Sequence, residues 1–366
     1  MKAPENRCKH RPARLLIAYL CLAMTSFSFV YAPAIQERHD LATWVKDLFS
    51  RRSALLITGE ARILDGFYGD NRGGIKARAH ELFRSACLVT WLKTHHARLL
   101  SVKPDLRLLH IEKGREQTIY VTVSTLFSYC YPQAKKAAYT LAGYTTYHVM
   151  SIVKNGSRWQ ITYEWYEDPL CAHVYQTRNG SADLQIEPVA VAPSSSDLRI
   201  AAVAYADRFC GVTVPRISNG RYNQKYPDLS MKGGDCANYA SQVLTDPGAG
   251  RMGQDWGWWS GRRGATVTWT RADAMVGHLL YTGRASLMAK GNLEQLQAGG
   301  DLARLLPGDI IAYQEKGVIC HVAVVAGHDD RGWPLVDCHT ADRYRNPFDL
   351  GWGPQIKYWL LRTAID

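Results

Sequence analysis

The spacing of apolar residues changes from a helical period to a strand period within the first half of the chain. Apolar residues recur at intervals of three and four over residues 40–58 and 75–100, which predicts two amphipathic helices. Residues 117–124, 144–153 and 158–165 alternate in polarity and are rich in β-branched and aromatic residues, which predicts strands. An Asn-Gly pair between the last two predicts a hairpin turn. The first half therefore reads as two helices packed on a small antiparallel sheet.

The second half of the chain shows the same order of helices before strands. Helical patterns cover residues 197–209, a short segment from Asp235, and a segment from Trp269 to about Arg284. Strand patterns follow within residues 309–313, 319–327, 334–340 and 355–361. Helices first and an antiparallel sheet last is an α+β arrangement, so we predict an α+β fold.

A stretch of linker composition separates the two halves. Residues 179–196 contain an Asn-Gly pair, two prolines and three consecutive serines. We therefore expect an accessory α+β domain at residues 35–178, a linker at 179–196 and a second domain at 197–366. Each of the two domains is long enough to bury its own core.

The first 34 residues have the layout of a secretory signal peptide. Basic residues between Lys2 and Arg14 precede an apolar run from Leu15 to Ala32, and small residues follow up to Ala34. A retained amino-terminal membrane anchor is the alternative. Later segments are too short and too polar to span a bilayer, so we expect no stable membrane span after cleavage. The sequence thus predicts a secreted or cell-envelope protein, either periplasmic or extracellular.

The chain is basic. Residues 1–34 hold five Lys or Arg and one Glu, so their removal lowers the formal net charge from +11 to +7. A basic secreted protein is attracted to anionic surfaces such as wall polymers or lipid headgroups, although solubility alone explains the same charge equally well. Basic runs interleaved with aromatic residues are missing from the sequence, which argues against nucleic acid as a partner.

The cysteine count indicates a free thiol. Nine cysteines become seven when the leader is removed, and an odd number in an exported protein leaves at least one unpaired. The other six remain candidates for disulfides, whose connectivity the sequence does not fix. The sequence has no C-x-x-C pair, which argues against a zinc ribbon.

One of these cysteines, Cys236, follows a turn suited to activate it. A thiol attacks only as thiolate, so something must lower its pKa. Gly233 and Gly234 permit a sharp turn, and Asp235 is a preferred N-cap residue, which places Cys236 in the first turn of a helix. The free amides there favour negative charge and could also bind the oxyanion of a tetrahedral intermediate, with Asp235 and Cys236 as the candidates.

A base for this thiol is expected from the strands that follow. Alternation places His321 on one face of its strand, and Asp337 and His339 together on one face of the next. A hairpin centred on residue 330 would set His321 directly opposite His339, close enough for His339 to orient the His321 ring. A slip of one residue would break this pairing.

Two other arrangements of the same residues are less suitable. A zinc site of Cys320, His321, Cys338 and His339 would need neighbours on a strand to converge, although they point to opposite faces. A disulfide between Cys320 and Cys338 would span a diagonal of roughly 7–8 Å between strands. We therefore expect no metal, and the sequence indicates no cofactor.

Several ordered motifs in the second half carry a family resemblance. These motifs are Tyr222–Asp228, Gly233–Gln242, Trp269–Ala272, Leu306–Ile311, His321 and Asp337–Thr340. From about residue 197 to its end, the chain resembles the bacterial Putative amidase domain family. That family is similar to cell-wall hydrolases with a papain-like core, including the cysteine/histidine-dependent amidohydrolases. The resemblance implies a papain-like fold with Cys236 as nucleophile, His321 as base and His339 as third residue, with Asp337 as its substitute.

The sequence also departs from the common family pattern. Ala237 and Tyr239 stand where most members have Thr and Phe, which leaves the substrate preference open. A tryptophan cluster could line a substrate groove or equally form part of the core; its members are Trp256, Trp258, Trp259 and Trp269. The segment Tyr163–Pro169 resembles, more loosely, the region that often precedes this domain.

The sequence therefore predicts a secreted cysteine amidase or peptidase that forms a thioester intermediate. Cell-wall peptide is the expected substrate, and an anionic wall polymer is the expected surface. Two alternatives remain open: a catalytically inactive wall-binding or sensing protein on the same fold, and a cysteine acyltransferase that uses the same residues.

Overall fold

The computed structural model describes residues 37–112, 116–132, 138–170, 196–213, 222–230 and 234–365. The predicted signal peptide and all but the last residue of the predicted linker lie outside these ranges, so both stay predictions. The chain divides into two compact units, residues 1–48 and 49–366, and a helix over residues 37–58 contains the boundary between them. The strands described below belong to the second unit.

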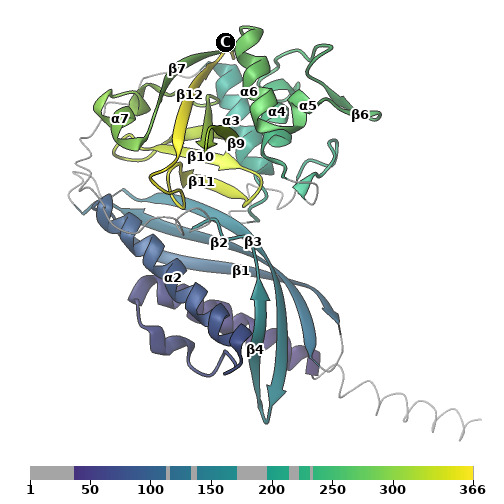
Figure 1. Ribbon diagram of the computed structural model, residues 1–366, viewed down its shortest axis with the longest axis vertical. Coiled ribbons are helices and arrows are strands. Elements are labelled where there is room, and N and C mark those ends of the chain that lie inside the picture. The colour runs from purple at the N-terminus through teal and green to yellow at the C-terminus, as the bar shows by residue number, and fades with distance from the viewer. Residues whose placement is uncertain are drawn as a thin grey trace, which may run out of the picture. The chain divides into compact units, whose positions relative to one another are not determined.

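Ten antiparallel strands form one large sheet (Figure 1). They are β1 (Arg98–Glu112), β2 (Gln117–Cys130), β3 (Thr140–Asn155), β4 (Arg158–Trp165), β7 (Ala285–Gly291), β8 (Ile310–Glu315), β9 (Val318–His328), β10 (Pro334–Cys338), β11 (Arg343–Pro347) and β12 (Lys357–Thr363). Their order is β1-β2-β3-β11-β10-β9-β8-β12-β7, with β4 also paired to β3. A separate two-stranded hairpin is formed by β5 (Ser260–Gly261) and β6 (Gly264–Ala265).

The helices surround this sheet. They are α2 (Arg72–Thr94), α3 (Asp197–Phe209), α4 (Cys236–Thr245), α5 (Val267–Thr270), α6 (Ala272–Tyr281) and α7 (Leu293–Ala298), with 3₁₀ turns η1 (Ala61–Leu64) and η4 (Leu302–Arg304). Within the described residues no helix is both long and apolar enough to cross a membrane. Helices and an antiparallel sheet together confirm the predicted α+β class.

Strand β3 joins the two halves of the sheet. One of its edges pairs with β2 along its length, while the other edge is shared between β4 and β11. Tyr144 pairs with Arg343, so the sheet continues from the amino-terminal strands into the carboxyl-terminal ones. The predicted division into domains at 35–178 and 197–366 stays a prediction, and one sheet runs through both segments.

Two layers of core residues lie on opposite faces of the carboxyl-terminal strands. Alternation along β9 sends Val322 and Val324 into the core under α3, α4 and α6, and sends Ala323 and Val325 into the core on the other face. Helix α4 is buried at every position, and Tyr239 anchors it by donating from its hydroxyl to the carbonyl of Ala206 at 2.8 Å. This packing fixes the start of α4 against β9.

The local predictions hold best where pattern and turn chemistry agree. The hairpin between β3 and β4 turns at Gly156, whose φ of 61° is readily available to glycine. Ser196 caps α3 by accepting from the amide of Arg199 at 3.3 Å, as expected. The strands β2, β4, β8, β9 and β12 lie where the alternation predicted them.

Other local predictions were wrong. The helix predicted over residues 75–100 ends at Thr94, because His96 takes a left-handed φ of 51° and Ala97 donates back to Leu92. The rest of that segment begins the edge strand β1, which the prediction missed although its residues alternate between apolar and polar from Leu100 to Leu108. The helix predicted from Trp269 is broken at Arg271, which is extended, and the strands β7 and β11 were missed.

Candidate active site

Cys236 is the first residue of α4, as the sequence predicted. Gly234 before it has a φ of 117°, a conformation that few residues other than glycine adopt, and a Cβ there would lie 3.2 Å from Thr340 Oγ1. Glycine is therefore needed for the turn that points α4 at the sheet. Cys236 is 8% exposed and belongs to the core between α4 and the sheet. Gly233 lies outside the described residues.

The Cys236 thiol meets a break in the sheet between β9 and β10. Val325 donates its amide to Asp309, on the side of β8, so the amides of Val324 and Val322 point toward β10. The pairing of β10 with β9 ends at Asp337 and Val324. The amide of Val322 is thus beyond the ladder, and it hydrogen-bonds to the thiol. The backbone of β9 immediately after His321 therefore contacts Cys236.

The pKa of the Cys236 thiol is raised to about 11. Burial is the largest cause, while hydrogen bonds from the amides of Val322, Ala237 and Cys236 itself act in the opposite direction. The helix N-terminus lowers the pKa of the thiol, as expected, but desolvation raises that pKa by more. In this structure the group is therefore a neutral thiol at neutral pH, and it needs a base to become a nucleophile.

His321 lies in β9 directly opposite Tyr313 of β8 and is 7% exposed. Its ring contacts Tyr313 edge to face, with centroids 5.2 Å apart, and Trp352 at 5.5 Å. The ring therefore lies on the sheet face away from α4, next to the break through which the thiol meets β9. The link between the two residues is through the backbone, because the amide that acts on the thiol belongs to Val322, the residue after His321.

The predicted pairing of His321 with His339 is wrong. The hairpin is centred one residue later than predicted, because Pro334 pairs with His328, and a bulge between Leu335 and Val336 corrects only half of the offset, so that Asp337 pairs with Val324. Strand β10 ends at Cys338, before His339. The sequence could not locate this bulge, because turn composition does not fix where an extra residue is accommodated.

The His339 ring instead bonds to residues around the turn before α4. Its Nδ1 lies 2.5 Å from Asp235 Oδ2 and its Nε2 lies 2.6 Å from the carbonyl oxygen of Phe209. Both partners are acceptors, so the hydrogen bonding is complete only when both ring nitrogens carry a proton. The fully buried ring also stacks between Tyr222 and Tyr239, at centroid distances of 3.6 and 4.1 Å. His339 therefore positions Asp235.

Asp235 is the N-cap residue of α4 by position, but its side chain makes no capping bond. Its Oδ1 accepts from the amide of Leu229 at 2.9 Å and from Asn238 Nδ2 at 2.8 Å, and Oδ2 faces His339. Its own amide donates to Thr340 Oγ1 at 2.7 Å and is thus unavailable for an oxyanion. Of the two predicted oxyanion groups, Asp235 has a positioning role, while the amide of Cys236 faces the thiol.

Asp337, the substitute third residue, points to a different set of partners. Its Oδ1 accepts from the amide of Arg345 at 2.6 Å, and its Oδ2 has no hydrogen-bond partner. Burial and the neighbouring carboxylate of Asp207 raise the pKa of Asp337 well above its ordinary value of 3.8. A proton on Oδ2 would supply the donor that this pair of carboxyl groups lacks. Asp337 thus belongs to the contact between α3 and β11.

The four candidate tryptophans divide into two kinds. Trp258 and Trp269 are fully buried, and their Nε1 groups donate to Ser241 Oγ at 2.9 Å and Asn238 Oδ1 at 2.8 Å. These two are core residues, so the groove interpretation fails for them. Trp259 is half-buried and Trp256 is 93% exposed, so only these two are accessible to a ligand.

Three residues of the site escaped the sequence interpretation: Asn238, Thr340 and Tyr222. Asn238 links Asp235 to Trp269 and also donates to the carbonyl of Pro227 at 2.8 Å. All three lie inside the family motifs. Each is a polar or aromatic residue among apolar neighbours, and this contrast could have identified them as site residues. Their role is to fix the turn that carries Cys236.

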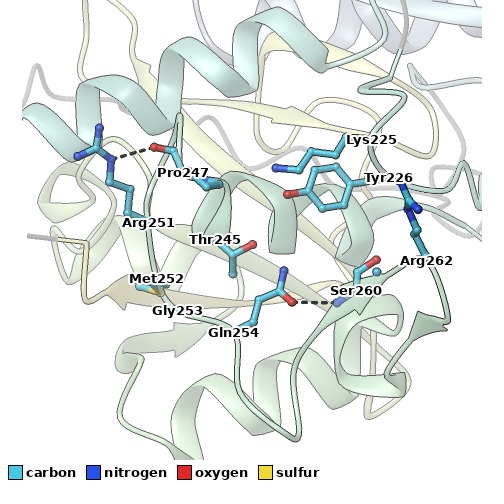
Figure 2. A pocket seen from close by; sticks show the side chains of 11 residues that line it. Lys225, Tyr226, Thr245, Pro247, Arg251, Met252, Gly253, Gln254, Ser260 and Arg262 are labelled. Atoms are coloured by element: carbon cyan, nitrogen blue, oxygen red, sulfur yellow. Dashed lines mark hydrogen bonds between the residues drawn. The ribbon is translucent and has the colours of Figure 1, made fainter.

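A pocket of about 800 Å³ opens at the other end of α4 (Figure 2). Its walls include Lys225, Tyr226 and Thr245, together with the loop that contains Gln254 and Arg262. Helix α4 rises by ~1.5 Å per residue, so Thr245 lies ~14 Å from Cys236 along the helix axis. The pocket does not contain the thiol.

The cysteines and histidines form no metal centre in the described part of the chain, where no group of three or more metal-binding side chains converges. The six cysteines described there are free thiols, among them exposed Cys320 and buried Cys338, and Cys171 lies outside the described residues. Cys236 is thus one of several free thiols, distinguished by its place at the start of α4.

Comparison with known proteins supports a single family assignment. Residues 196–361 match the family described as Putative amidase domain, which confirms the resemblance seen in the motifs. This carboxyl-terminal segment is therefore similar to that family, whose description suggests hydrolysis of an amide. No curated protein and no solved structure matches the chain.

Proposed function

We propose that the protein is a cysteine amidase with a papain-like catalytic segment, in which Cys236 is the nucleophile and His321 the base. The observation that carries this proposal is the position of the Cys236 thiol at the start of α4, bonded to the β9 amide that follows His321. This arrangement lies within the segment that matches the Putative amidase domain family.

The chemistry follows from a thiol that is neutral at rest. His321 accepts the thiol proton as Cys236 Sγ attacks the carbonyl carbon and forms a carbon–sulfur bond. The amides of Val322, Ala237 and Cys236 converge on this position and provide donors for the negative oxygen. His321 then returns the proton to the amine as the carbon–nitrogen bond breaks. Water, deprotonated by His321, cleaves the thioester and restores the thiol.

Asp235, His339 and Thr340 are positioning residues in this proposal. They bind each other and the turn, and thereby fix the start of α4 relative to β9. A thiol displaced by even 1 Å would lose its alignment with the base and with the amide donors. The geometry of attack thus depends on residues that do not react.

Cell-wall peptide is the proposed substrate, and the cell envelope or the exterior is the proposed location. Support comes from the leader pattern of residues 1–34 and from the formal charge of +11, which favours anionic surfaces. An anionic wall polymer is the proposed surface. The fold itself does not select among amides.

An inactive wall-binding protein is the second candidate, and the burial of the thiol favours it. Cys236 is 8% exposed and its raised pKa keeps it protonated. On this alternative the mature protein would sediment with cell walls, and an electrophile such as iodoacetamide would leave Cys236 unmodified at neutral pH.

The test measures free amines released from purified peptidoglycan and from synthetic wall peptides. Wild type is compared with Cys236→Ala and with Cys320→Ser, which removes an exposed free thiol from the same strand as His321. We expect release by wild type and Cys320→Ser and none by Cys236→Ala. Equal release by all three proteins would exclude Cys236 as the nucleophile, and binding without release by any of them would favour the inactive protein.

A further inference from the structure

The pocket at the carboxyl end of α4 carries an excess of positive charge. Lys225, Arg251 and Arg262 line it, and all three are exposed. Figure 2 shows the Lys225 amine beside Tyr226 and the Arg251 guanidinium turned toward Pro247, whose carbonyl accepts from Nε at 2.9 Å. Carboxylate side chains are missing from the pocket wall, so its field attracts an anion.

Two of these cations are already engaged, whereas the third is available. Lys225 Nζ lies 3.1 Å from Asp246 Oδ2, and Arg251 binds the backbone. Arg262 makes no hydrogen bond or ion pair with any residue that the structure describes. It lies in the turn of the hairpin between β5 and β6, where Gly264 has a φ of 125°. An arginine presented this way can bind a carboxylate through two parallel hydrogen bonds.

A segment of chain, called the strap below, connects this pocket with the turn before Cys236. Residues 225–229 run beside α4, with Tyr226 Oη donating to Asp246 Oδ2 at one end and the amide of Leu229 donating to Asp235 Oδ1 at the other. Midway, the carbonyl of Pro227 accepts from Asn238. The strap thus follows the helix axis from the pocket to the residue before Cys236, and its side-chain bonds fix the separation of the two places.

That separation matches a short extended peptide. Four extended residues span ~13 Å, which is close to the ~14 Å rise of α4 between Cys236 and Thr245. A peptide with its reacting carbonyl at Cys236 would therefore place a group about four residues away at the pocket. The loop that forms the pocket wall also presents Trp256, which is 93% exposed although its turn is fixed by Asp255.

We propose that this pocket is a substrate subsite that binds a carboxylate about four residues from the reacting amide, with Arg262 as its principal contact. The inference rests on the proposed amidase function and adds to it an acidic substrate of defined length. A carboxylate fits the planar guanidinium of Arg262 through two parallel hydrogen bonds, and the test below separates it from a phosphate.

Binding is best measured with the full chain carrying Cys236→Ala, which holds the peptide without cleaving it. Titration calorimetry at low salt compares three synthetic peptides that are identical except at the residue four positions from the test amide, which carries a free carboxylate, a neutral amide or a phosphoserine. We expect the carboxylate peptide to bind about tenfold more tightly than the amide peptide. Arg262→Gln should abolish this difference, while Arg304→Gln, an exposed arginine paired with Asp301, should preserve it.

Equal affinity for the carboxylate and amide peptides would overturn the inference, as would a preference that Arg262→Gln leaves intact. Tightest binding of the phosphoserine peptide would overturn the choice of carboxylate. Hydrolysis by the protein with native Cys236 separates this inference from the proposed function. Cleavage with the same KM in native and Arg262→Gln proteins would reject the subsite alone. Selective binding without any cleavage would reject the amidase and keep the subsite.

Discussion

Two buried groups of titratable side chains compensate for desolvation in different ways. The amino-terminal cluster lies among the helix that ends at residue 58, α2 and the strands β3 and β4. Its arginines pair with carboxylates, and His148, whose pKa burial lowers, bonds to one of them; the members are Arg52, Glu81, Arg84, His148, Glu164 and Asp168. The Cys236 site instead buries a thiol that contacts backbone amides.

This difference in partners distinguishes a cluster that stabilises the fold from a site that can react. In the amino-terminal cluster, Arg52 Nη2 lies 2.6 Å from Glu164 Oε2, and His148 Nδ1 lies 2.8 Å from Glu164 Oε1. Burial alone would raise the pKa of Glu164, but Arg52 and His148 lower it to about 2. A group held so firmly in one charge state stabilises the fold and is a poor acid or base. The groups that act on the Cys236 thiol are backbone amides and the carboxylate of Asp235, so its charge can change during a reaction.

The largest expected effect is on catalysis at the thiol. Cys236→Ala should lower amide hydrolysis by about a thousandfold or more, because no other group can form the thioester. Its free energy of unfolding should change by only about 1 kcal/mol, since a small side chain is lost. Turnover assays and urea unfolding together check this. If Cys236→Ala retained hydrolysis, or if it unfolded, the distinction between the reactive Cys236 site and the structural amino-terminal cluster would fail.

The second prediction concerns the amino-terminal cluster. Glu164→Gln should lower the free energy of unfolding by about 3 kcal/mol, because buried Arg52 loses the carboxylate that bonds it at 2.6 Å and keeps only Glu81 at 3.5 Å. Urea unfolding compares it with Glu60→Gln, an exposed residue at which we expect a change within about 0.5 kcal/mol. Folded Glu164→Gln should still hydrolyse the substrate. A loss of stability equal to that of the control would show that the charge pairing is not what stabilises this cluster.

The same residue predicts a pH dependence. The pKa of Glu164 is lower in the folded protein, about 2, than its ordinary value of 4.5, so the folded state binds fewer protons between these values. Its contribution to stability is complete above about pH 4.5 and is lost as the pH falls toward 2. Unfolding measured between pH 3 and 6 should therefore show a smaller acid slope for Glu164→Gln than for wild type. Identical slopes would contradict the assigned shift.

A smaller effect is expected from the residue that positions the turn. His339→Gln should lower kcat by about ten- to a hundredfold with little change in KM, because Asp235 loses the ring nitrogen that lies 2.5 Å from its Oδ2 while the substrate contacts remain. The pH profile of kcat should keep its shape, since His339 takes no part in proton transfer. A shifted profile would return His339 to the role of third catalytic residue that the sequence suggested.

The smallest effect concerns Asp337. Its pKa is raised by burial and by Asp207, so the folded state retains a proton that the unfolded chain releases above its ordinary value of 3.8. Stability from this group is complete below that value and falls as the pH rises toward the folded pKa. Asp337→Asn removes the charge and should make unfolding less sensitive to rising pH. A steeper loss of stability in the variant would contradict this assignment.

The sequence was sufficient where local chemistry decides the outcome. The turn at Gly234, the start of α4 at Cys236 and the strand that carries His321 all follow from residue type and spacing. The strand β1 was missed although its residues alternate between apolar and polar from Leu100 to Leu108 and it pairs with the next strand, β2. The short strand β11 has a polar sequence and pairs with the distant strand β3, so tertiary pairing, which the local pattern does not encode, creates it.

Registry and burial account for the errors within the site. The turn between β9 and β10 is centred one residue later than predicted and β10 ends before His339, so His339 does not pair with His321. The pKa of Cys236 depends on how much of α4 is covered, which a sequence motif does not report. Both quantities arise only when the whole sheet has formed.

The most direct test of the account is identification of the acyl-enzyme intermediate. Wild type is mixed with a wall peptide amide, quenched in acid within milliseconds to seconds, digested and analysed by mass spectrometry, with Cys236→Ala as the control. Acid preserves a thioester, so we predict the acyl mass on the peptide that contains Cys236 and on no other. Amine release with no acyl adduct, or an adduct on a different residue that persists in Cys236→Ala, would contradict the assignment of Cys236 as the nucleophile.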